Sequence, residues 1–193
     1  MKILRLPLLL LLCGNSLLSF PQSLRPAATP SNPHLVRPTV YPSGVSFSPS
    51  PPPTITLDGF TLRHDHDSLY WLNDWRLPYP VYRFDTGDVD GDGSIDAMVG
   101  VIKPTRYFPQ KGRRLFIFKL VNGKARPLWM GSKLGGTLHD FRFTDGKIRS
   151  LETTTDSLYV VVDYRWSGFG MAFDRFILKN VDEATALTAF YND

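Results

Sequence analysis

Two-residue turn signals between short strand-like runs constrain the fold of this chain more than any other feature. Asp58-Gly59, Asn122-Gly123 and Asp145-Gly146 each separate two runs that are rich in β-branched and aromatic residues. Asn-Gly and Asp-Gly favour the tight turns of β-hairpins, because both residues tolerate the positive φ angles that such turns need. The sequence therefore predicts three antiparallel hairpins.

Strand-like runs recur from Thr54 onward, and about ten of them show the period-two alternation of half-buried strands. Only residues 182–190 suggest a helix, for which Asp182 is a candidate N-cap. We expect residues 54–193 to form one all-β domain of antiparallel sheets with a core that needs no disulfide. Outside the hairpins, the predicted strands are residues 69–72, 81–84, 95–102, 158–166 and 171–178.

The first 53 residues have a different composition. A short basic start and the apolar run from Leu6 to Leu12 have the layout of a secretory signal, and the run is too short to span a bilayer. We assign residues 1–20 to this signal peptide. Residues 21–53 hold ten of the sixteen prolines, so we expect a disordered, extended Pro/Ser/Thr-rich linker.

Cys13 is the single cysteine, so no intrachain disulfide can form. It ends the run Leu10-Leu11-Leu12, which resembles the lipobox of bacterial lipoproteins and implies lipidation of Cys13, although Leu12 is larger than the residue usual there. Cleavage of an ordinary signal peptide after Ser16 or near Ala28 is the alternative. Both interpretations predict an exported protein of the periplasm, outer membrane or cell surface.

An acidic loop over residues 85–96, between two predicted strands, is the clearest chemical signal. Aspartates stand at relative positions 1, 3, 5 and 9, with Gly93 at position 6 and a backbone carbonyl of Ser94 at position 7. Calcium takes about six to eight oxygen ligands, and glycine permits the sharp turn around the ion. The spacing predicts a Ca²⁺ site formed by Asp88, Asp90, Asp92, Ser94 and Asp96.

Two other interpretations of this loop can be compared with the metal site. An EF-hand would need a bidentate glutamate at position 12, which is Val99 here, and helices rather than strands as its flanks. A solvated acidic turn would use the aspartates to accept backbone N–H bonds. We favour metal binding, because closely spaced carboxylates repel one another unless a cation lies between them.

The stretch from Phe84 to Gly100 resembles the calcium loops of FG-GAP and VCBS repeats, which occur in integrin-α-like β-propeller blades. The resemblance implies a structural ion, with ligation by the four aspartate side chains and the Ser94 carbonyl. Such propellers have about seven blades, whereas this chain has one such loop and strands for two or three. We therefore expect propeller-blade-like hairpins or a β-sandwich, or an oligomer that completes a ring.

Other polar groups offer weaker signals. His64 and His66 would share one face of a strand and could form half a zinc site, to which His139-Asp140 could contribute, but a polar hairpin edge is the favoured interpretation. A glycosidase-type carboxylate pair could be formed by Asp163 with Asp174 or Glu152. No catalytic residue is assigned, because nucleophile-elbow, phosphate-loop and zincin motifs are missing.

The sequence favours binding over catalysis. Trp166 and Phe169 flank a glycine-rich turn, where exposed rings could contact a glycan or a partner protein. Four of the 22 basic residues lie in residues 1–53 and the other 18 in residues 54–193 with all 18 acidic ones, so a nucleic-acid interface is not predicted. We expect a calcium-stabilised extracytoplasmic binding or structural protein of the cell envelope. A secreted polysaccharide hydrolase and a subunit of a larger surface assembly are the alternatives.

Overall fold

The computed structural model describes residues 39–40, 45–46, 54–65, 69–106, 108–131 and 133–192. The predicted signal peptide, with Cys13, lies outside the described residues, as does most of the predicted linker. Within residues 21–53, only β1 (Thr39–Val40) and β2 (Val45–Ser46) are described, and β2 pairs with β7. None of the helices in the described part of the chain has the length and apolarity to cross a membrane.

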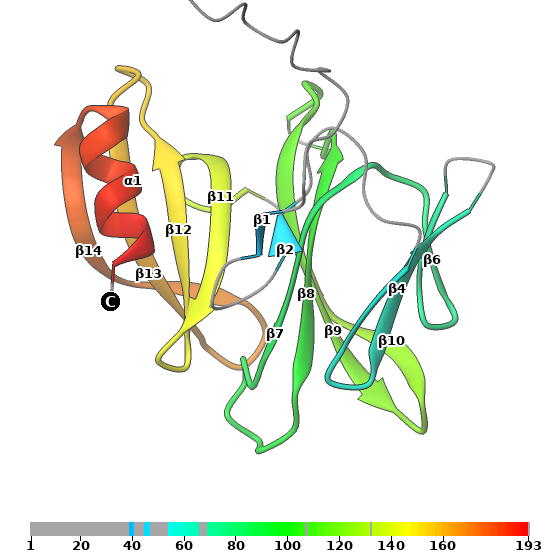
Figure 1. The fold of residues 1–193 in the computed structure, drawn as a ribbon. Helices are drawn as coiled ribbons and strands as arrows, with labels where there is room; N and C mark the ends of the chain where they lie inside the picture. The colour runs from blue at the N-terminus through cyan, green and yellow to red at the C-terminus, as the bar shows by residue number, and fades with distance from the viewer. Residues whose placement is uncertain are drawn as a thin grey trace, which may run out of the picture. The chain divides into compact units, whose positions relative to one another are not determined.

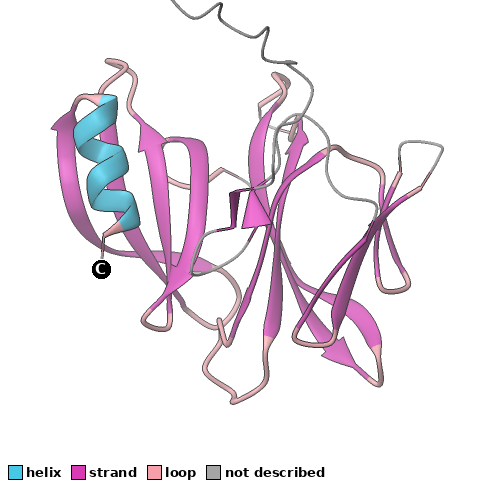
Figure 2. Ribbon diagram, viewed as in Figure 1, coloured by secondary structure: helices cyan, strands magenta, loops and turns pink. Residues whose placement is uncertain are grey.

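Three antiparallel sheets, each built mainly from four consecutive strands, form the domain (Figures 1 and 2). This confirms the all-β antiparallel prediction. We call them the N-terminal, central and C-terminal sheets. The N-terminal sheet contains β3 (Thr54–Leu57), β4 (Phe60–His64), β5 (Tyr70–Leu72) and β6 (Trp75–Leu77). The central sheet contains β7 (Val81–Gly87), β8 (Asp96–Lys103), β9 (Gly112–Val121) and β10 (Lys124–Met130), with β1 and β2 beyond β7. The C-terminal sheet contains β11 (Thr137–Thr144), β12 (Lys147–Thr153), β13 (Tyr159–Trp166) and β14 (Met171–Val181), and helix α1 (Glu183–Tyr191) follows.

The hairpin turns have the backbone that their residues predict. Asp58, Asn122 and Asp145 have φ angles of 46°, 51° and 51°, and the glycine after each also has positive φ. These turns join β3 to β4, β9 to β10 and β11 to β12. The N-cap prediction for α1 is also confirmed, because the Asp182 carboxylate accepts a bond from the Thr185 N–H at 3.0 Å. The sequence analysis missed β6, whose turn includes Asn73 at φ 50°.

The central sheet is buried on both faces. Ala97, Val99 and Val101 of β8 pack toward the N-terminal sheet, whereas Met98 packs toward the C-terminal sheet. Strand β9 divides its apolar side chains in the same way. The continuous apolar runs in these two strands therefore reflect a sheet covered on both sides, which is unusual for antiparallel strands.

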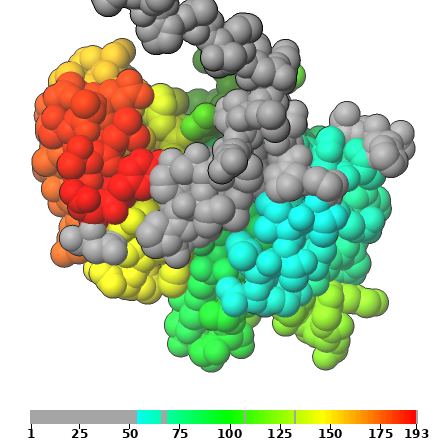
Figure 3. Space-filling view, viewed as in Figure 1, coloured from blue at the N-terminus to red at the C-terminus, as the bar shows by residue number. Residues whose placement is uncertain are grey.

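The two outermost faces of the three sheets are closed in different ways. The N-terminal sheet presents a polar outer face. On it the hydroxyl oxygens of Thr56 and Thr61 lie 3.2 Å apart, and the Arg63 guanidinium lies over the Trp71 ring. The C-terminal sheet is covered by α1, whose buried Ala186 and Phe190 pack on the sheet, and Figure 3 shows the red helix against its strands. Within the described residues, the outer faces of the N-terminal and C-terminal sheets therefore offer no bare apolar surface on which another sheet could pack.

A buried ion cluster joins the central and C-terminal sheets. The fully buried guanidinium of Arg83 lies 3.6 Å from Asp85 Oδ2 and 3.4 Å from Asp140 Oδ2. Both carboxylates also accept backbone N–H bonds, and one of these runs from Phe143 in β11 to Asp85 in β7. Burial raises the pKa of both carboxyl groups, although Arg83 opposes the shift.

Close packing at the same interface also requires a glycine in β8. A Cβ atom on Gly100 of β8 would lie 2.6 Å from the Tyr82 ring and 3.0 Å from the Phe141 ring. These two rings meet edge to face with centroids 6.2 Å apart, so they cannot both retreat without losing their contact. Gly100 thus sets how closely the central and C-terminal sheets approach.

We expect Arg83→Met to lower the free energy of unfolding by about 3–5 kcal/mol, because it leaves two buried carboxylates without their cation. Asp85 and Asp140 should then hold protons more tightly in the folded than in the unfolded protein. The loss should therefore grow as the pH rises from about 5 to about 8. Urea unfolding at several pH values measures this.

Arg126→Met is the matched control, since Arg126 forms an ion pair with Asp74 in which both side chains are more than 40% exposed. Its loss should be about 0–1 kcal/mol and nearly independent of pH. Equal effects of the two substitutions would contradict the role assigned to Arg83.

Candidate metal centre in the loop between β7 and β8

The acidic loop is closed by the last residue pair of β7 and β8, Gly87 with Asp96. Gly91 and Gly93 have φ angles of 75° and 85°, which lets the backbone turn sharply. Asp88 organises the turn, because its carboxylate accepts N–H bonds from Gly91, Asp92 and Gly93 at 2.8–3.1 Å. The hydrogen bonds expected of an acidic turn are therefore present, and they fix the position of the Asp88 carboxylate.

Three of the predicted ligands converge. Asp88, Asp90 and Asp96 each place one carboxylate oxygen within 4.8 Å of the others. Among the described residues, this is the one group of three or more His, Cys, Asp or Glu side chains that could hold a metal ion. Three carboxylate oxygens on one tight loop suit a hard divalent cation.

Asp96 lies at the base of this group and is completely buried. Its Oδ2 atom accepts the Val89 N–H at 3.0 Å, but its Oδ1 atom has no hydrogen-bond partner, and neither has the buried Oδ1 of Asp90. Burial, with a smaller contribution from the neighbouring Asp90 charge, raises the pKa of Asp96 to about 6. Buried carboxylate oxygens without partners are costly, and a bound cation would remove that cost.

Lys119 is a neighbour that the sequence analysis missed. It stands opposite Asp96 in the pairing of β8 with β9, and its Nζ atom lies 2.7 Å from Asp90 Oδ2, 2.5 Å from Asp92 Oδ2 and 3.9 Å from Asp96 Oδ1. Desolvation opposes the charged form, but the bonds to Asp90 and Asp92 raise the pKa of Lys119. The ammonium group thus balances part of the acidic charge in this conformation.

The other two predicted ligands, Asp92 and Ser94, lie in the exposed part of the loop, outside this group of three carboxylates. Asp92 is exposed, accepts the Ser94 N–H at 2.9 Å and bonds to Lys119, whose hydrogen bond lowers the pKa of Asp92. Ser94 is in the exposed part of the loop. The described conformation therefore brings together three of the four predicted aspartates.

The two predicted contact residues have different surroundings. Trp166 at the end of β13 is partly buried against the core between the central and C-terminal sheets, and it lines a surface hollow with Asp88 and Asp90. Phe169 is 89% exposed in the turn closed by the bond from Ser167 N to Gly170 O. The chain thus places an indole beside the acidic loop and a free ring on the next turn.

The histidines do not share a site within the described residues. His64 stacks on Tyr70 in the N-terminal sheet, with ring centroids 4.6 Å apart. His139, in the C-terminal sheet, bonds through Nε2 to Thr153 at 3.0 Å. The central sheet lies between them, and His66 is outside the described residues.

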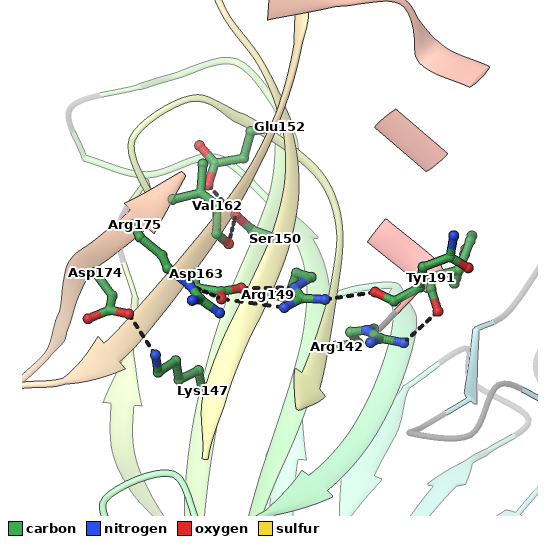
Figure 4. A network of polar contacts seen from close by, with 11 residues as sticks. Arg142, Lys147, Arg149, Ser150, Glu152, Val162, Asp163, Asp174, Arg175 and Tyr191 are labelled. Atoms are coloured by element: carbon green, nitrogen blue, oxygen red, sulfur yellow. Dashed lines mark hydrogen bonds and ion pairs between the residues drawn. The ribbon is translucent and has the colours of Figure 1, made fainter. Parts of the chain in front are cut away.

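The three candidate catalytic carboxylates each have hydrogen-bond partners of their own. Asp163 lies on the face of the C-terminal sheet that carries α1, where Arg149 and Arg175 donate to it at 2.9 and 3.1 Å. Asp174 bonds Lys147 at 2.8 Å, whereas Glu152 lies on the opposite face and accepts from Ser150. Figure 4 shows both groups of contacts. Glu152 and Asp163 therefore do not face a common cleft.

The arginines in this network also hold the end of α1. Arg142 donates to the carbonyl of Tyr191 at 3.2 Å, and Arg149 donates to the carbonyl of Asn192 at 2.9 Å (Figure 4). Carbonyls at the end of a helix lack intrahelical donors and carry partial negative charge. Two buried cations are therefore well placed to fasten the helix to the sheet.

No model of a known protein family matches the chain, and no curated protein or solved structure is significantly similar to it. Function is therefore inferred from the fold and from the contacts within the described residues.

We expect Asp96→Asn to have opposite effects without and with metal. Because the folded-state pKa of Asp96 is raised, the chelated protein should lose stability as the pH rises through about 6. In chelator at pH 8, the neutral amide should therefore increase the free energy of unfolding by about 1–3 kcal/mol. In excess Ca²⁺ the wild type should gain stability and the variant should not, as thermal unfolding with and without Ca²⁺ measures.

Asp156→Asn, in the exposed turn between β12 and β13, is the control and should change neither value. A variant that still gains stability from Ca²⁺ would contradict the assignment of Asp96 as a ligand.

Proposed function

We propose that this chain is an exported, calcium-stabilised protein of the cell envelope that acts by binding or as a structural component. The metal site carries the proposal. Its main support is the buried carboxylate of Asp96, which lies close to those of Asp88 and Asp90 and whose Oδ1 atom lacks a hydrogen-bond partner.

The ion would be structural. Asp88, Asp90 and Asp96 would hold it through their side chains, and the resemblance to FG-GAP and VCBS loops adds Asp92 and the Ser94 carbonyl. Bound Ca²⁺ supplies positive charge that cancels the repulsion between the carboxylates. Lys119 would have to withdraw from Asp90, because an ammonium group and a divalent cation compete for the same oxygens.

The fold supports the family resemblance in one further respect. A propeller blade is a sheet of four antiparallel strands, and each of the three sheets of this domain contains four antiparallel strands that are consecutive in the chain, although β1 and β2 extend the central one to six. The polar outer face of the N-terminal sheet and the helix on the C-terminal sheet favour a three-sheet domain over one segment of a closed ring.

The contacts of the acidic residues favour a binding function over hydrolysis. Asp163 and Asp174 are both engaged by cationic side chains, and the carboxylates of the metal site belong to one tight loop. A hydrolase needs an acid and a base that face the same bond, or a metal ion with an open coordination position.

Terbium luminescence tests the metal site, because Tb³⁺ replaces Ca²⁺ and is excited through a nearby indole. We expect emission that depends on Trp166, which lines the same hollow as Asp88 and Asp90, and that added Ca²⁺ displaces. Asp90→Ala should abolish the emission. Lys119→Met should tighten Ca²⁺ binding about tenfold, since it removes a competing charge.

Trp71→Phe, in the N-terminal sheet, is the control for Trp166→Phe and should leave the emission unchanged. Lys124→Met, in the exposed hairpin of the central sheet, is the control for Lys119→Met. Emission that survives Asp90→Ala would show that Tb³⁺ binds elsewhere and would remove the basis of the proposal.

Export is tested on the full chain in a bacterial host. The mature protein should begin at Cys13, carry the mass of a lipid modification and partition with membranes, because two or three acyl chains anchor a protein stably. Cys13→Ser should move it to the soluble fraction. An unmodified N-terminus at residue 17 or later would contradict lipidation, and a retained Met1 would contradict export.

A further inference from the structure

The C-terminal sheet has a cavity on the face that is turned toward the central sheet. Strands β11 and β12 pack on the central sheet there, whereas β13 and β14 leave a space of about 530 Å³. Val160 and Val162 form part of its floor, and the connection from β10 to β11 reaches it through residues 133–136. Its volume is within the usual range of about 300–1,000 Å³ for small-molecule sites.

A buried carboxylate lies at the base of this cavity. Glu152 is 1% exposed and accepts bonds from the Ser150 hydroxyl at 2.6 Å and from the Gly136 N–H. Tyr164, whose hydroxyl accepts the Gly135 N–H at 3.0 Å, lies beside it, and burial together with the Glu152 charge raises the pKa of this phenol. None of the described basic residues forms an ion pair with Glu152, so its charge is balanced only by neutral donors. A carboxylate has about four acceptor positions, so Glu152 can accept a further bond from a ligand hydroxyl.

Two aromatic rings also line the cavity. Phe173 and Phe176 of β14 are 52% and 42% exposed, with ring centroids 4.9 Å apart. Residues three apart would face opposite sides of a regular strand, but register shifts in the pairing of β13 with β14 bring both rings to the cavity. Such bulges are a means of redirecting side chains, and here they expose an apolar surface that folding alone does not need.

The opening of the cavity is cationic. Lys179 holds its ammonium group 4.1 Å from the centre of the Phe176 ring, and the exposed Lys133 also lines the cavity, with its ammonium group 5.2 Å from the centre of the Phe108 ring. Lys133 also borders a second hollow with Lys111 and Arg114. Positive charge therefore continues from the cavity along the neighbouring surface.

We propose that this cavity binds an acidic saccharide, with one uronate-type ring inside it. A single such ring offers what each part of the cavity needs: an apolar C–H face for Phe173 and Phe176, hydroxyl donors for Glu152, and a carboxylate for the two lysines. A fatty acyl chain would fit less well, because it would cover the Glu152 carboxylate without offering a donor. The site is separate from the metal loop, so the inference goes beyond the proposed function.

Isothermal titration of the full-length mature protein with a trisaccharide of galacturonate residues tests this, compared with a neutral galactose trisaccharide of the same linkage. The acidic probe should bind at least about tenfold more tightly than the neutral one. Phe176→Ala should weaken binding of both probes about tenfold, since it removes the stacking surface. Lys133→Met with Lys179→Met should reduce binding of the acidic probe to that of the neutral one.

Val121→Ala and Lys124→Met are the matched controls, because both residues are exposed in the distant hairpin of the central sheet. Glu152→Gln, which keeps the shape of the side chain, should weaken the binding of both probes. Its circular dichroism spectrum and melting temperature should stay close to those of the wild type.

Each titration is repeated in chelator. Binding that persists there, and in Asp90→Ala, places the probe in the cavity even if the calcium proposal fails. Binding that is lost in chelator and in Asp90→Ala would place the uronate on the metal loop and overturn the inference. So would equal affinity for the two probes, or no heat of binding with either.

Discussion

The buried guanidinium of Arg83 is the contact on which the arrangement of the sheets depends. It lies between Asp85 of its own strand and Asp140 of β11, and thereby fixes how the central and C-terminal sheets pack. Apolar packing alone tolerates sliding of one sheet over another, whereas a buried ion cluster has one arrangement in which every charge is matched. The acidic loop, the cavity and α1 all take their positions from sheets placed in this way.

The metal loop and the cavity solve related electrostatic problems differently. In the loop, carboxylates are gathered so closely that they need a cation, and Lys119 supplies part of that charge in the described conformation. In the cavity, the single carboxylate of Glu152 is satisfied by neutral donors, so it needs no cation. This difference supports the two proposals, a cation in the loop and a ligand hydroxyl group beside Glu152 in the cavity.

Local features of the fold were predictable from the sequence, and long-range ones were not. The turns at Asn122-Gly123 and Asp145-Gly146 were predictable because their residues determine the backbone within two positions. The three-residue strand β6 was too short to show the alternation of apolar and polar residues that marks a strand. Lys119 reaches the acidic loop only through the register of β8 with β9, and Arg83 contacts Asp140, which lies 57 positions further along the chain. The convergence of the Asp88, Asp90 and Asp96 carboxylates could be predicted from their spacing, whereas the contact of Asp92 with Lys119 could not.

The chain-order arrangement of the strands has a consequence for how the domain assembles. Apart from the pairing of β2 with β7, each sheet pairs consecutive strands, so most of its hydrogen bonds close short loops, and strand pairing within a sheet should be rapid. The central sheet, however, is apolar on both faces and remains exposed to water until both neighbours have packed on it. Until both outer sheets have joined it, the central sheet would therefore be the part of the chain most open to aggregation.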